Sequence, residues 1–295
     1  MNKIIGTLLL ILFACQLNAQ SFEVLILGIA QDAGRPQLGC EKDCCKNVGR
    51  PNHVASIAIA TETKFWIIDA TPDLPAQYAM ARNAFPDREF AGIFLTHAHI
   101  GHYTGLMYLG KESMNAQNTP VYCMPRMATF LESNGPWSQL VSNKNIDIVS
   151  ITSNVSIPLS STVSITPTSV PHRDEYSETV GFLVASQEKK GIYIPDIDKW
   201  DRWSESIAGY VKMLDFALLD GTFYDGEEIP NREMSEIPHP FIQESMSHFE
   251  QLSESDKKKI HFIHFNHTNP VIADGPEYDL VKKNGYQIAR TGMKL

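Results

Sequence analysis

Short apolar runs separated by polar turns extend along most of the chain, and several runs end in a histidine or an aspartate. Residues 22–28 are apolar and end at a glycine, which predicts a first strand. Residues 53–60 and 64–69 alternate and then become apolar, as paired strands do. Residues 91–95 form a short apolar run directly before a histidine-rich segment. We therefore predict buried strands that lead into polar loops.

The rest of the chain mixes strands and helices. Residues 103–114 and 127–132 are predicted helices, and residues 146–165 are predicted to hold several short strands separated by Ser, Thr and Asn. Further apolar strands are predicted at residues 179–184, 191–195, 216–220 and 260–265. Because the chain has no internal repeat, low-complexity tract or Gly/Ser linker, residues 20–295 are predicted to form a single domain.

The first 19 residues have a different character. A single lysine precedes an apolar run from Ile4 to Ala14, and Leu17-Asn-Ala19 offers a small-residue cleavage site. The run is too short to span a membrane, so residues 1–19 are predicted to be a secretory signal peptide. Residues 12–15 loosely resemble a lipoprotein cleavage box, but Phe13 fits that box poorly. Soluble export to the periplasm or medium is therefore favoured over anchoring at Cys15.

Composition and charge narrow the class of partner. The 295 residues are 43% hydrophobic, which is enough for a large core, and the net charge is −9. Phosphate backbones are bound by clustered Lys and Arg, and this sequence has no basic run. A nucleic acid is therefore not expected as a partner, whereas a small-molecule substrate is.

Three of the ten histidines, His97, His99 and His102, lie within six residues. Two imidazoles at positions i and i+2 of an extended segment point to the same side and can bind one cation. The third, in a turn three residues later, can reach the same ion or a second ion beside it. A chance cluster of loop histidines is the alternative, and the apolar strand immediately before the cluster argues against it.

This segment resembles the H-x-H-x-D-H signature of the metallo-β-lactamase superfamily, with Gly101 in the position of the aspartate. The resemblance implies an α/β fold, an αββα sandwich of two mixed sheets with outer helices and a metal site at one edge. It also implies that the missing aspartate would help to hold a second ion. We therefore expect an intact first site and a weak second site, and we expect Gly101→Asp to raise the metal content.

Other strand ends match the superfamily's ligand order. The resemblance implies His97, His99 and His172 as ligands of the first metal, and His102, Asp196 and His264 as ligands of the second. It implies that Asp196 also positions or deprotonates the attacking water, and that Asp69 orients the histidine loop. His239 resembles an auxiliary catalytic histidine of the tRNase Z branch, although a helix cap is the simpler alternative. Asp220, at another strand end, is expected to be structural.

A cysteine cluster forms a further candidate metal site. Three cysteines in six residues of an exported chain suggest disulfides, but adjacent Cys44 and Cys45 do not bond easily to each other, and Cys123 is distant. A zinc site is the alternative. In a phosphodiesterase branch that this chain resembles, such a cluster binds structural zinc with a C-terminal histidine. The resemblance implies Cys40, Cys44, Cys45 and His267, although the C-x3-C-C spacing differs from that branch's C-x-C-x2-C.

The order of these motifs over residues 22–270 resembles the branch that contains pyrroloquinoline quinone biosynthesis protein B and related phosphodiesterases. The resemblance implies a zinc-dependent hydrolase of a small ester-like substrate, such as a phosphodiester, lactone or lactam, that uses metal-activated water. One alternative is a non-haem iron oxygenase, because two histidines and a carboxylate with open positions suit Fe(II). Another is a non-catalytic binding protein with a degenerate site.

Overall fold

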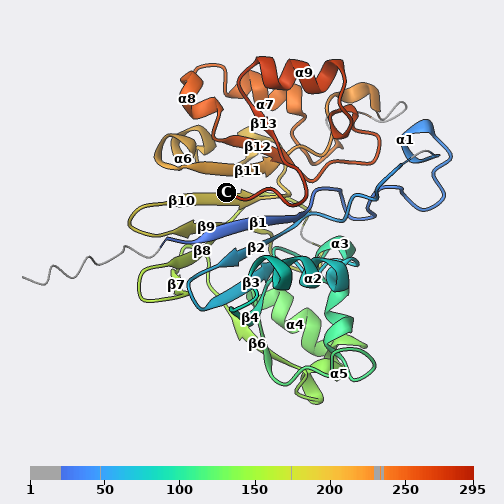
Figure 1. The fold of residues 1–295 in the computed structure, drawn as a ribbon, viewed down its shortest axis with the longest axis vertical. Coiled ribbons are helices and arrows are strands. Elements are labelled where there is room, and N and C mark those ends of the chain that lie inside the picture. The colour runs from blue at the N-terminus through green and yellow to red at the C-terminus, as the bar shows by residue number, and fades with distance from the viewer. Residues whose placement is uncertain (1–20, 47, 174, 229–232, 234–235) are drawn as a thin grey trace, which may run out of the picture.

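Two mixed β-sheets pack face to face between two layers of helices (Figure 1). The computed structural model describes residues 21–46, 48–173, 175–228, 233 and 236–295, so the predicted signal peptide lies outside the described residues. The layers are those of an αββα sandwich, which confirms the predicted fold class.

The first sheet contains six strands in sequential order. They are β1 (Glu23–Gly28), β2 (Ser56–Ala60), β3 (Lys64–Ile68), β4 (Glu89–Phe94), β5 (Thr119–Cys123) and β6 (Ile146–Ser150). Strands β1 to β3 pair antiparallel, and strands β3 to β6 pair parallel. Strands β1, β3, β4, β5 and β6 therefore all point toward the same edge of the sheet.

The second sheet contains seven strands, with the same change from antiparallel to parallel pairing. They are β7 (Ile157–Pro158), β8 (Ser164–Ser169), β9 (Val180–Ala185), β10 (Lys190–Ile194), β11 (Phe216–Asp220), β12 (Ile260–Ile263) and β13 (Gln287–Ile288). Strands β7 to β10 pair antiparallel, and strands β10 to β13 pair parallel. Strands β8, β10, β11 and β12 consequently end on one side.

The helices divide between the two outer faces (Figure 1). Those that cover the first sheet are α2 (Leu74–Ala84), α4 (Pro125–Ser133) and α5 (Trp137–Ser142). Those on the side of the second sheet are α6 (Ile207–Met213), α7 (Ile242–His248), α8 (Glu254–Lys257) and α9 (Pro276–Lys283). The short helix α1 (Asp43–Lys46) lies apart, on a loop that projects beyond the sheets.

The two-residue period of the strands explains how one sheet can be buried on both faces. In β1, Val24 and Ile26 join the core between the two sheets, whereas Leu25 and Leu27 join the core beneath the helices. Full burial of one such side chain contributes about 1.5–3 kcal/mol. The apolar run of the sequence is therefore required by two cores at once.

The predicted helix over residues 103–114 is wrong in detail. The structure has a one-turn helix α3 (Ile100–Tyr103) followed by a 3-10 helix, Thr104–Leu109. The backbone of Ala70 interrupts the helical pattern, because its N–H donates to the His102 carbonyl and its carbonyl accepts from the Gly105 N–H. This connection holds the histidine loop against the end of β3.

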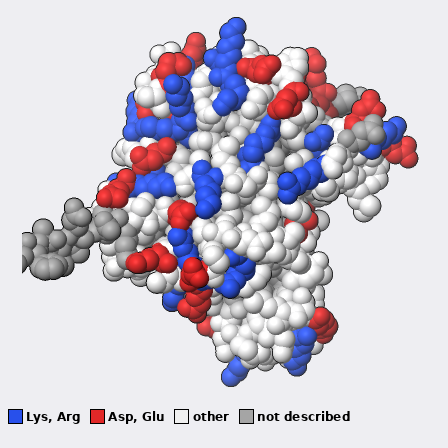
Figure 2. Space-filling view, in the orientation of Figure 1, with Lys and Arg blue, Asp and Glu red and all other residues white. Residues whose placement is uncertain are grey.

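The molecular surface carries charges of both signs. On the face seen in Figure 2, Lys and Arg side chains lie among Asp and Glu over the upper and middle parts of the molecule, and most of the lower part is formed by uncharged residues. Within the described ranges, no helix is both long enough and apolar enough to cross a membrane.

Candidate metal centre

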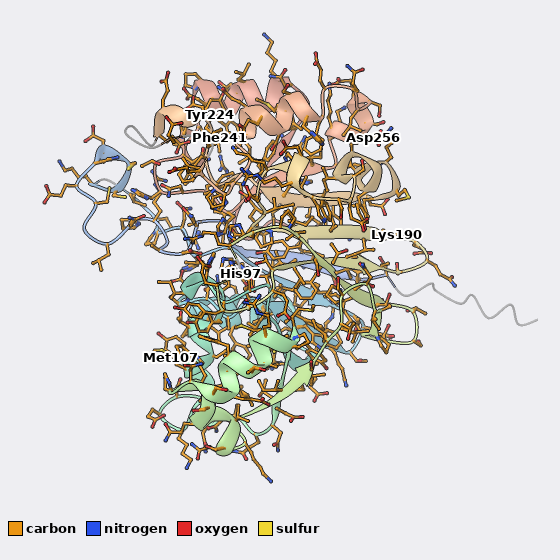
Figure 3. The ribbon with its side chains drawn as sticks, turned by 180° about the vertical axis from the view of Figure 1, so that it is seen from behind. His97, Met107, Lys190, Tyr224, Phe241 and Asp256 are labelled. Carbon is orange, nitrogen blue, oxygen red and sulfur yellow. The ribbon has the colours of Figure 1, made fainter. Side chains whose placement is uncertain are left out.

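Polar side chains from both sheets meet at one edge of the sandwich. Asp69 follows β3, Asp196 follows β10 and His264 follows β12, each at the carboxyl end of its strand. His97 follows β4 and lies at this edge between the two helical layers (Figure 3). The parallel strands therefore bring together residues that are far apart in the sequence.

His97, His99 and His172 form the first candidate site. His97 Nε2 lies 2.8 Å from His99 Nδ1. The centre of the His172 ring lies 5.4 Å from that of His97 and 5.1 Å from that of His99. One nitrogen of each ring lies within 4.8 Å of the other two. Three nitrogens in this arrangement can bind one zinc ion at about 2.0–2.1 Å.

The second candidate site contains His102, Asp196 and His264, as the sequence predicted, and also Asp32. His102 Nε2 lies 3.0 Å from Asp196 Oδ2 and 3.1 Å from Asp32 Oδ1. His264 Nε2 lies 3.1 Å from Asp196 Oδ2 and 3.7 Å from Asp32 Oδ1. Two imidazoles and two carboxylates therefore surround one point.

Asp196 lies between the two sites. Its Oδ2 atom faces the second site and lies 3.7 Å from His97 Nε2 of the first. Its Oδ1 atom lies 3.7 Å from His172 Nε2 and 3.5 Å from His239 Nδ1. Because the two oxygens face different sets of nitrogens, this carboxylate can contact an ion in either site.

Five donor atoms of this centre are buried but lack partners. They are His102 Nε2, His172 Nε2, His264 Nε2, Asp32 Oδ1 and Asp196 Oδ2, and none has a hydrogen-bond partner within the described chain. Buried polar atoms in folded proteins are nearly always paired, so a group of unpaired atoms that face one another calls for a ligand. Imidazole nitrogens with carboxylate oxygens fit zinc or iron.

An aspartate–threonine pair orients the histidines of the first sheet. Asp69 Oδ2 accepts from His102 Nδ1 at 2.7 Å, and its Oδ1 accepts from the Thr96 amide at 2.8 Å. The Thr96 hydroxyl donates to Asp69 and accepts from His97 Nδ1 at 2.9 Å. Protonation of both Nδ1 atoms leaves Nε2 free to bind metal. The predicted orienting role of Asp69 has this geometry.

A second aspartate–threonine pair orients the histidines of the second sheet. The Thr222 hydroxyl donates to Asp220 Oδ1 at 2.7 Å and accepts from His264 Nδ1 at 3.0 Å. Asp220 Oδ2 accepts from His239 Nδ1 at 2.8 Å. Asp220, which the sequence suggested to be structural, therefore contacts the centre's own histidine. The two sheets use the same arrangement on opposite sides of Asp196.

Two residues of the centre adopt left-handed backbone conformations that are uncommon outside glycine. They are Asp69 at φ 71° and His264 at φ 67°. Such conformations cost about 1–3 kcal/mol and are found mostly at functional sites. Both strands therefore turn sharply at the point where their last residue reaches the centre.

The two sites differ in protonation when no metal is bound. Burial lowers the pKa of His97 well below its usual range and lowers that of His172 to about 4. Burial would also lower the pKa of His102, but the carboxylates of Asp69, Asp196 and Asp32 outweigh it and raise that pKa well above the usual value. The first site is thus neutral, and the second holds a proton that a metal must displace.

Histidine 239 is buried beside both sites. Burial would lower its pKa, but the Asp220 carboxylate outweighs burial and raises it. The His239 ring centre lies 5.3 Å from that of His172. His239 is therefore a core residue of the centre and not a cap exposed at a helix terminus.

Asp32 was missed by the sequence analysis, which assigned the second site only three ligands. The structure corrects this, because the Asp32 carboxylate lies where the motif would otherwise supply one. The expectation that Gly101→Asp would add a ligand stays a prediction, and the packing around position 101 argues against it. A Cβ atom at position 101 would lie 2.5 Å from both Cα and Oδ1 of Asp32. One signal was available, since Asp32 follows the carboxyl end of a strand as the other ligands do.

The cysteine cluster is assembled as the resemblance implied. Cys40, Cys44, Cys45 and His267 have donor atoms within 4.8 Å of one another. The Cys40–Cys44 and Cys44–Cys45 sulfur distances are 4.0 Å and 3.9 Å, and no disulfide is formed among the described cysteines. Sulfurs 2.3 Å from a tetrahedral zinc ion would be about 3.8 Å apart. The structure therefore fits zinc better than a disulfide at this site.

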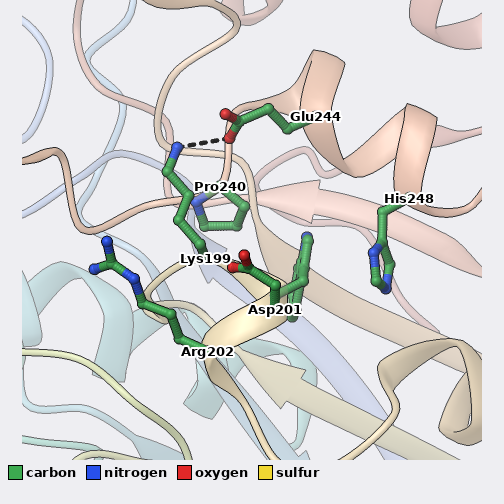
Figure 4. A pocket seen from close by; sticks show the side chains of 7 residues that line it. Lys199, Asp201, Arg202, Pro240, Glu244 and His248 are labelled. Carbon is green, nitrogen blue, oxygen red and sulfur yellow. Dashed lines mark hydrogen bonds and ion pairs between the residues drawn. The ribbon is translucent and has the colours of Figure 1, made fainter. Parts of the chain in front are cut away.

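A cleft of about 400 Å³ opens near the centre (Figure 4). Its lining includes Lys199, three residues after Asp196, and Pro240, which follows His239. Lys199 Nζ binds Glu244 Oε2 across the cleft at 2.6 Å. The metal-site residues themselves do not line this cleft.

Comparison with known proteins agrees with this architecture. Residues 66–265 match a family model described as beta-lactamase superfamily domain. Coenzyme PQQ synthesis protein B of Ectopseudomonas mendocina is 27% identical over 312 residues, which cover 92% of this chain and 99% of that protein. The relative of the same name from Stutzerimonas stutzeri is 26% identical over 311 residues, which cover 92% of this chain and 99% of that protein.

Solved structures share the fold. Zn(2+)-bound PqqB from Methylobacterium extorquens superimposes with a TM-score of 0.74 at 24% identity, and the match covers 92% of this chain and 99% of that one. A diphosphatase from the PhnP family gives a TM-score of 0.66 at 21% identity, over 93% and 96% of the two chains. With the family match over residues 66–265 and the strand-end metal centre, the chain belongs to the beta-lactamase superfamily.

Proposed function

We propose that this protein is a metal-dependent hydrolase of a small ester-like substrate, such as a phosphodiester, a lactone or a lactam. The observation that carries the proposal is the position of Asp196. Its Oδ2 atom faces the unpaired Nε2 atoms of His102 and His264, and its Oδ1 atom faces the unpaired Nε2 atom of His172. Zinc held by these groups supplies a Lewis acid and lowers the pKa of bound water to about 7.

The chain's own residues have distinct parts in such a reaction. Asp196 is buried, and its two oxygens face nitrogens of both sites, so it can orient a water molecule and accept its proton. Asp69 and Asp220 hold the imidazoles in one tautomer. Fixed groups of this kind need no reorganisation during the reaction, which is where most electrostatic catalysis arises.

His239 is the candidate general acid. Asp220 accepts its Nδ1 proton, which leaves Nε2 as the nitrogen available to a substrate. The same carboxylate favours the protonated imidazole. A protonated histidine next to the centre can donate to the leaving oxygen or nitrogen as the bond breaks.

The test is a hydrolysis assay on the zinc-loaded protein with three probes: bis(p-nitrophenyl) phosphate, an aryl lactone and a chromogenic β-lactam. We expect turnover of at least one probe and its loss in Asp196→Asn. Asp73→Asn is a matched control, because Asp73 lies in the loop after β3 but pairs with His53 and the Val54 amide. Hydrolysis that persists unchanged in Asp196→Asn would contradict the proposal.

A non-haem iron oxygenase is the second candidate, and the match to coenzyme PQQ synthesis protein B over 92% of the chain is the observation in its favour. Two histidines and a carboxylate with open positions suit Fe(II). The predicted signal peptide argues for hydrolysis, because work outside the cytoplasm suits a biosynthetic oxidation poorly. Oxygen uptake by the Fe(II)-loaded protein, without hydrolysis of any probe by the zinc form, would favour the oxygenase.

A further inference from the structure

We propose that Asp32, from the loop after β1, is the carboxylate ligand of the second metal site and replaces the aspartate that the histidine motif lacks at Gly101. The inference rests on the metal centre of the proposed function and adds a ligand to it. It also gives Gly101 a reason, since the motif position must be empty for Asp32 to occupy the site.

The position of Asp32 is that of a ligand. Its Oδ1 atom lies 3.1 Å from His102 Nε2 and 3.7 Å from His264 Nε2, the two nitrogens that also face Asp196. The side chain is 27% exposed, yet Oδ1 is buried and has no hydrogen-bond partner in the described structure. The carboxylate is therefore directed inward, toward the same point as the other three ligands.

Steric exclusion keeps position 101 without a side chain. A Cβ atom added to Gly101 would lie 2.5 Å from Asp32 Cα, 2.5 Å from Oδ1 and 2.9 Å from Cβ. Part of this contact is with backbone, so a change of the Asp32 rotamer cannot relieve it. With this backbone, position 101 has no room for a side chain, so the carboxylate comes from Asp32.

The backbone holds Asp32 next to His264. The Gln31 amide donates to the Phe265 carbonyl at 2.8 Å, and the Phe265 amide donates to the Ile29 carbonyl at 2.8 Å. The Asn266 side-chain amide adds a bond of 2.6 Å to Gln31 Oε1. The two residues that directly follow His264 are thus tied to the loop that carries Asp32, which fixes the two ligands relative to each other.

A purely structural role makes a different prediction. In that case Asp32 is only the ion-pair partner of a protonated His102, and its removal changes stability but leaves the second metal's affinity unchanged. The two roles can be separated by counting and titrating metal, without any assay of activity.

The experiment is a Co²⁺ titration of metal-depleted protein, followed by visible absorption and native mass spectrometry. Cobalt bound by thiolates gives intense charge-transfer bands, whereas cobalt bound by histidine and carboxylate gives weak d–d bands, so the cysteine site is counted separately. The chains compared are wild type, Asp32→Asn, Asp32→Ala, Gly101→Asp and the exchange Asp32→Gly/Gly101→Asp. Asp73→Asn is the control for a loop carboxylate outside the centre.

We expect two ions at the centre of the wild type. Asp32→Asn and Asp32→Ala should retain the first ion and weaken the second by about 100-fold or more, because loss of even an outer hydrogen-bond partner costs about 10–100-fold in metal affinity. Gly101→Asp alone should also lose the second ion, since it displaces Asp32. The exchange should not regain it, because the Cα atom of residue 32 would still lie 2.5 Å from the new Cβ atom.

Two results would overturn the inference. One is an unchanged second ion in Asp32→Asn, which keeps the shape of the side chain and should fold. The other is a gain of metal in Gly101→Asp alone, which would show that the two carboxylates can coexist. Either result leaves the proposed hydrolase standing. Absence of both centre ions from the wild type would instead contradict the proposed function itself.

Discussion

The two sites of the metal centre contain different kinds of ligand. The first site is made of three imidazoles and no carboxylate of its own, and two of the three come from one loop. The second site has two imidazoles and two carboxylates, drawn from four separate segments. The first is thus neutral and local, and the second is anionic and assembled by the fold.

The difference in ligands indicates which of the two sites depends more on the rest of the fold. Neutral imidazoles with lowered pKa values can bind metal without first releasing a proton. Negative charge at the second site allows an ion to sit beside another dication, because two such charges about 3.5–4 Å apart repel strongly. The second site should consequently be the one that is sensitive to the rest of the structure.

The largest effect is expected from removing the first site. His97→Ala/His99→Ala should abolish the first ion and lower any hydrolytic rate by about 10³-fold or more, because a metal ion supplies several kcal/mol of transition-state stabilisation. Metal analysis should still find zinc at the cysteine cluster. His248, an exposed histidine at the end of α7, provides the control. The variant His248→Ala should keep its full metal content. A full metal count in the double variant would refute the assignment.

Loss of the Asp69 carboxylate should weaken metal binding at the second site more than at the first. Asp69→Asn removes the direct acceptor of His102 Nδ1, whereas it affects His97 only through Thr96. The second ion should therefore weaken by about 10–100-fold and the first by less. Co²⁺ titration of Asp69→Asn against Asp73→Asn measures both. Equal weakening of the two ions would show that the halves are not independent.

The cysteine cluster should support the second site more than the first. Its ligands belong to the loop after Asp32 and to His267, three residues after His264. His267→Ala should release the structural zinc, lower the melting temperature and weaken the second ion by about tenfold, a modest loss compared with that of a direct ligand. The measurements are zinc content, thermal unfolding and Co²⁺ titration, again with His248→Ala as control.

The redox alternative for this cluster has a direct check. Mass spectrometry of the native protein after thiol blocking should find Cys40, Cys44 and Cys45 unbonded to one another or to Cys123. A Cys40–Cys123 disulfide would instead mean that the cluster is not a zinc site.

A gradual effect is expected from pH. Because the pKa of His102 is raised, a proton competes with the second ion, and competition grows as pH falls. The affinity of the second site should drop by about tenfold per pH unit below that pKa, whereas the first site should keep its ion until pH approaches the His172 pKa of about 4. Metal titrations between pH 8 and about 5 test the order of loss; simultaneous release would contradict it.

Local sequence patterns were enough to predict the strands, the fold class and the candidate ligands that lie at strand ends or in the histidine motif. The i, i+2 spacing of His97 and His99 and the apolar runs before Asp196 and His264 are readable, because strand periodicity and strand ends are properties of neighbouring residues. The helix predicted over residues 103–114 does not form as one element. The backbone of Ala70, which follows another strand, hydrogen-bonds to His102 and Gly105 and interrupts the helical pattern.

The carboxylate that Asp32 brings to the second site could be found only from the tertiary structure. Asp32 lies about 70 residues before His102 in the chain, and its value as a ligand depends on the pairing of Gln31 with Phe265. The clash between Gly101 and Asp32 likewise arises from packing and has no trace in either local sequence. Contacts of this kind depend on how distant segments meet, which neither residue type nor spacing specifies. The sequence motif lacks a carboxylate at Gly101, and the fold brings the carboxylate of Asp32 to the same site.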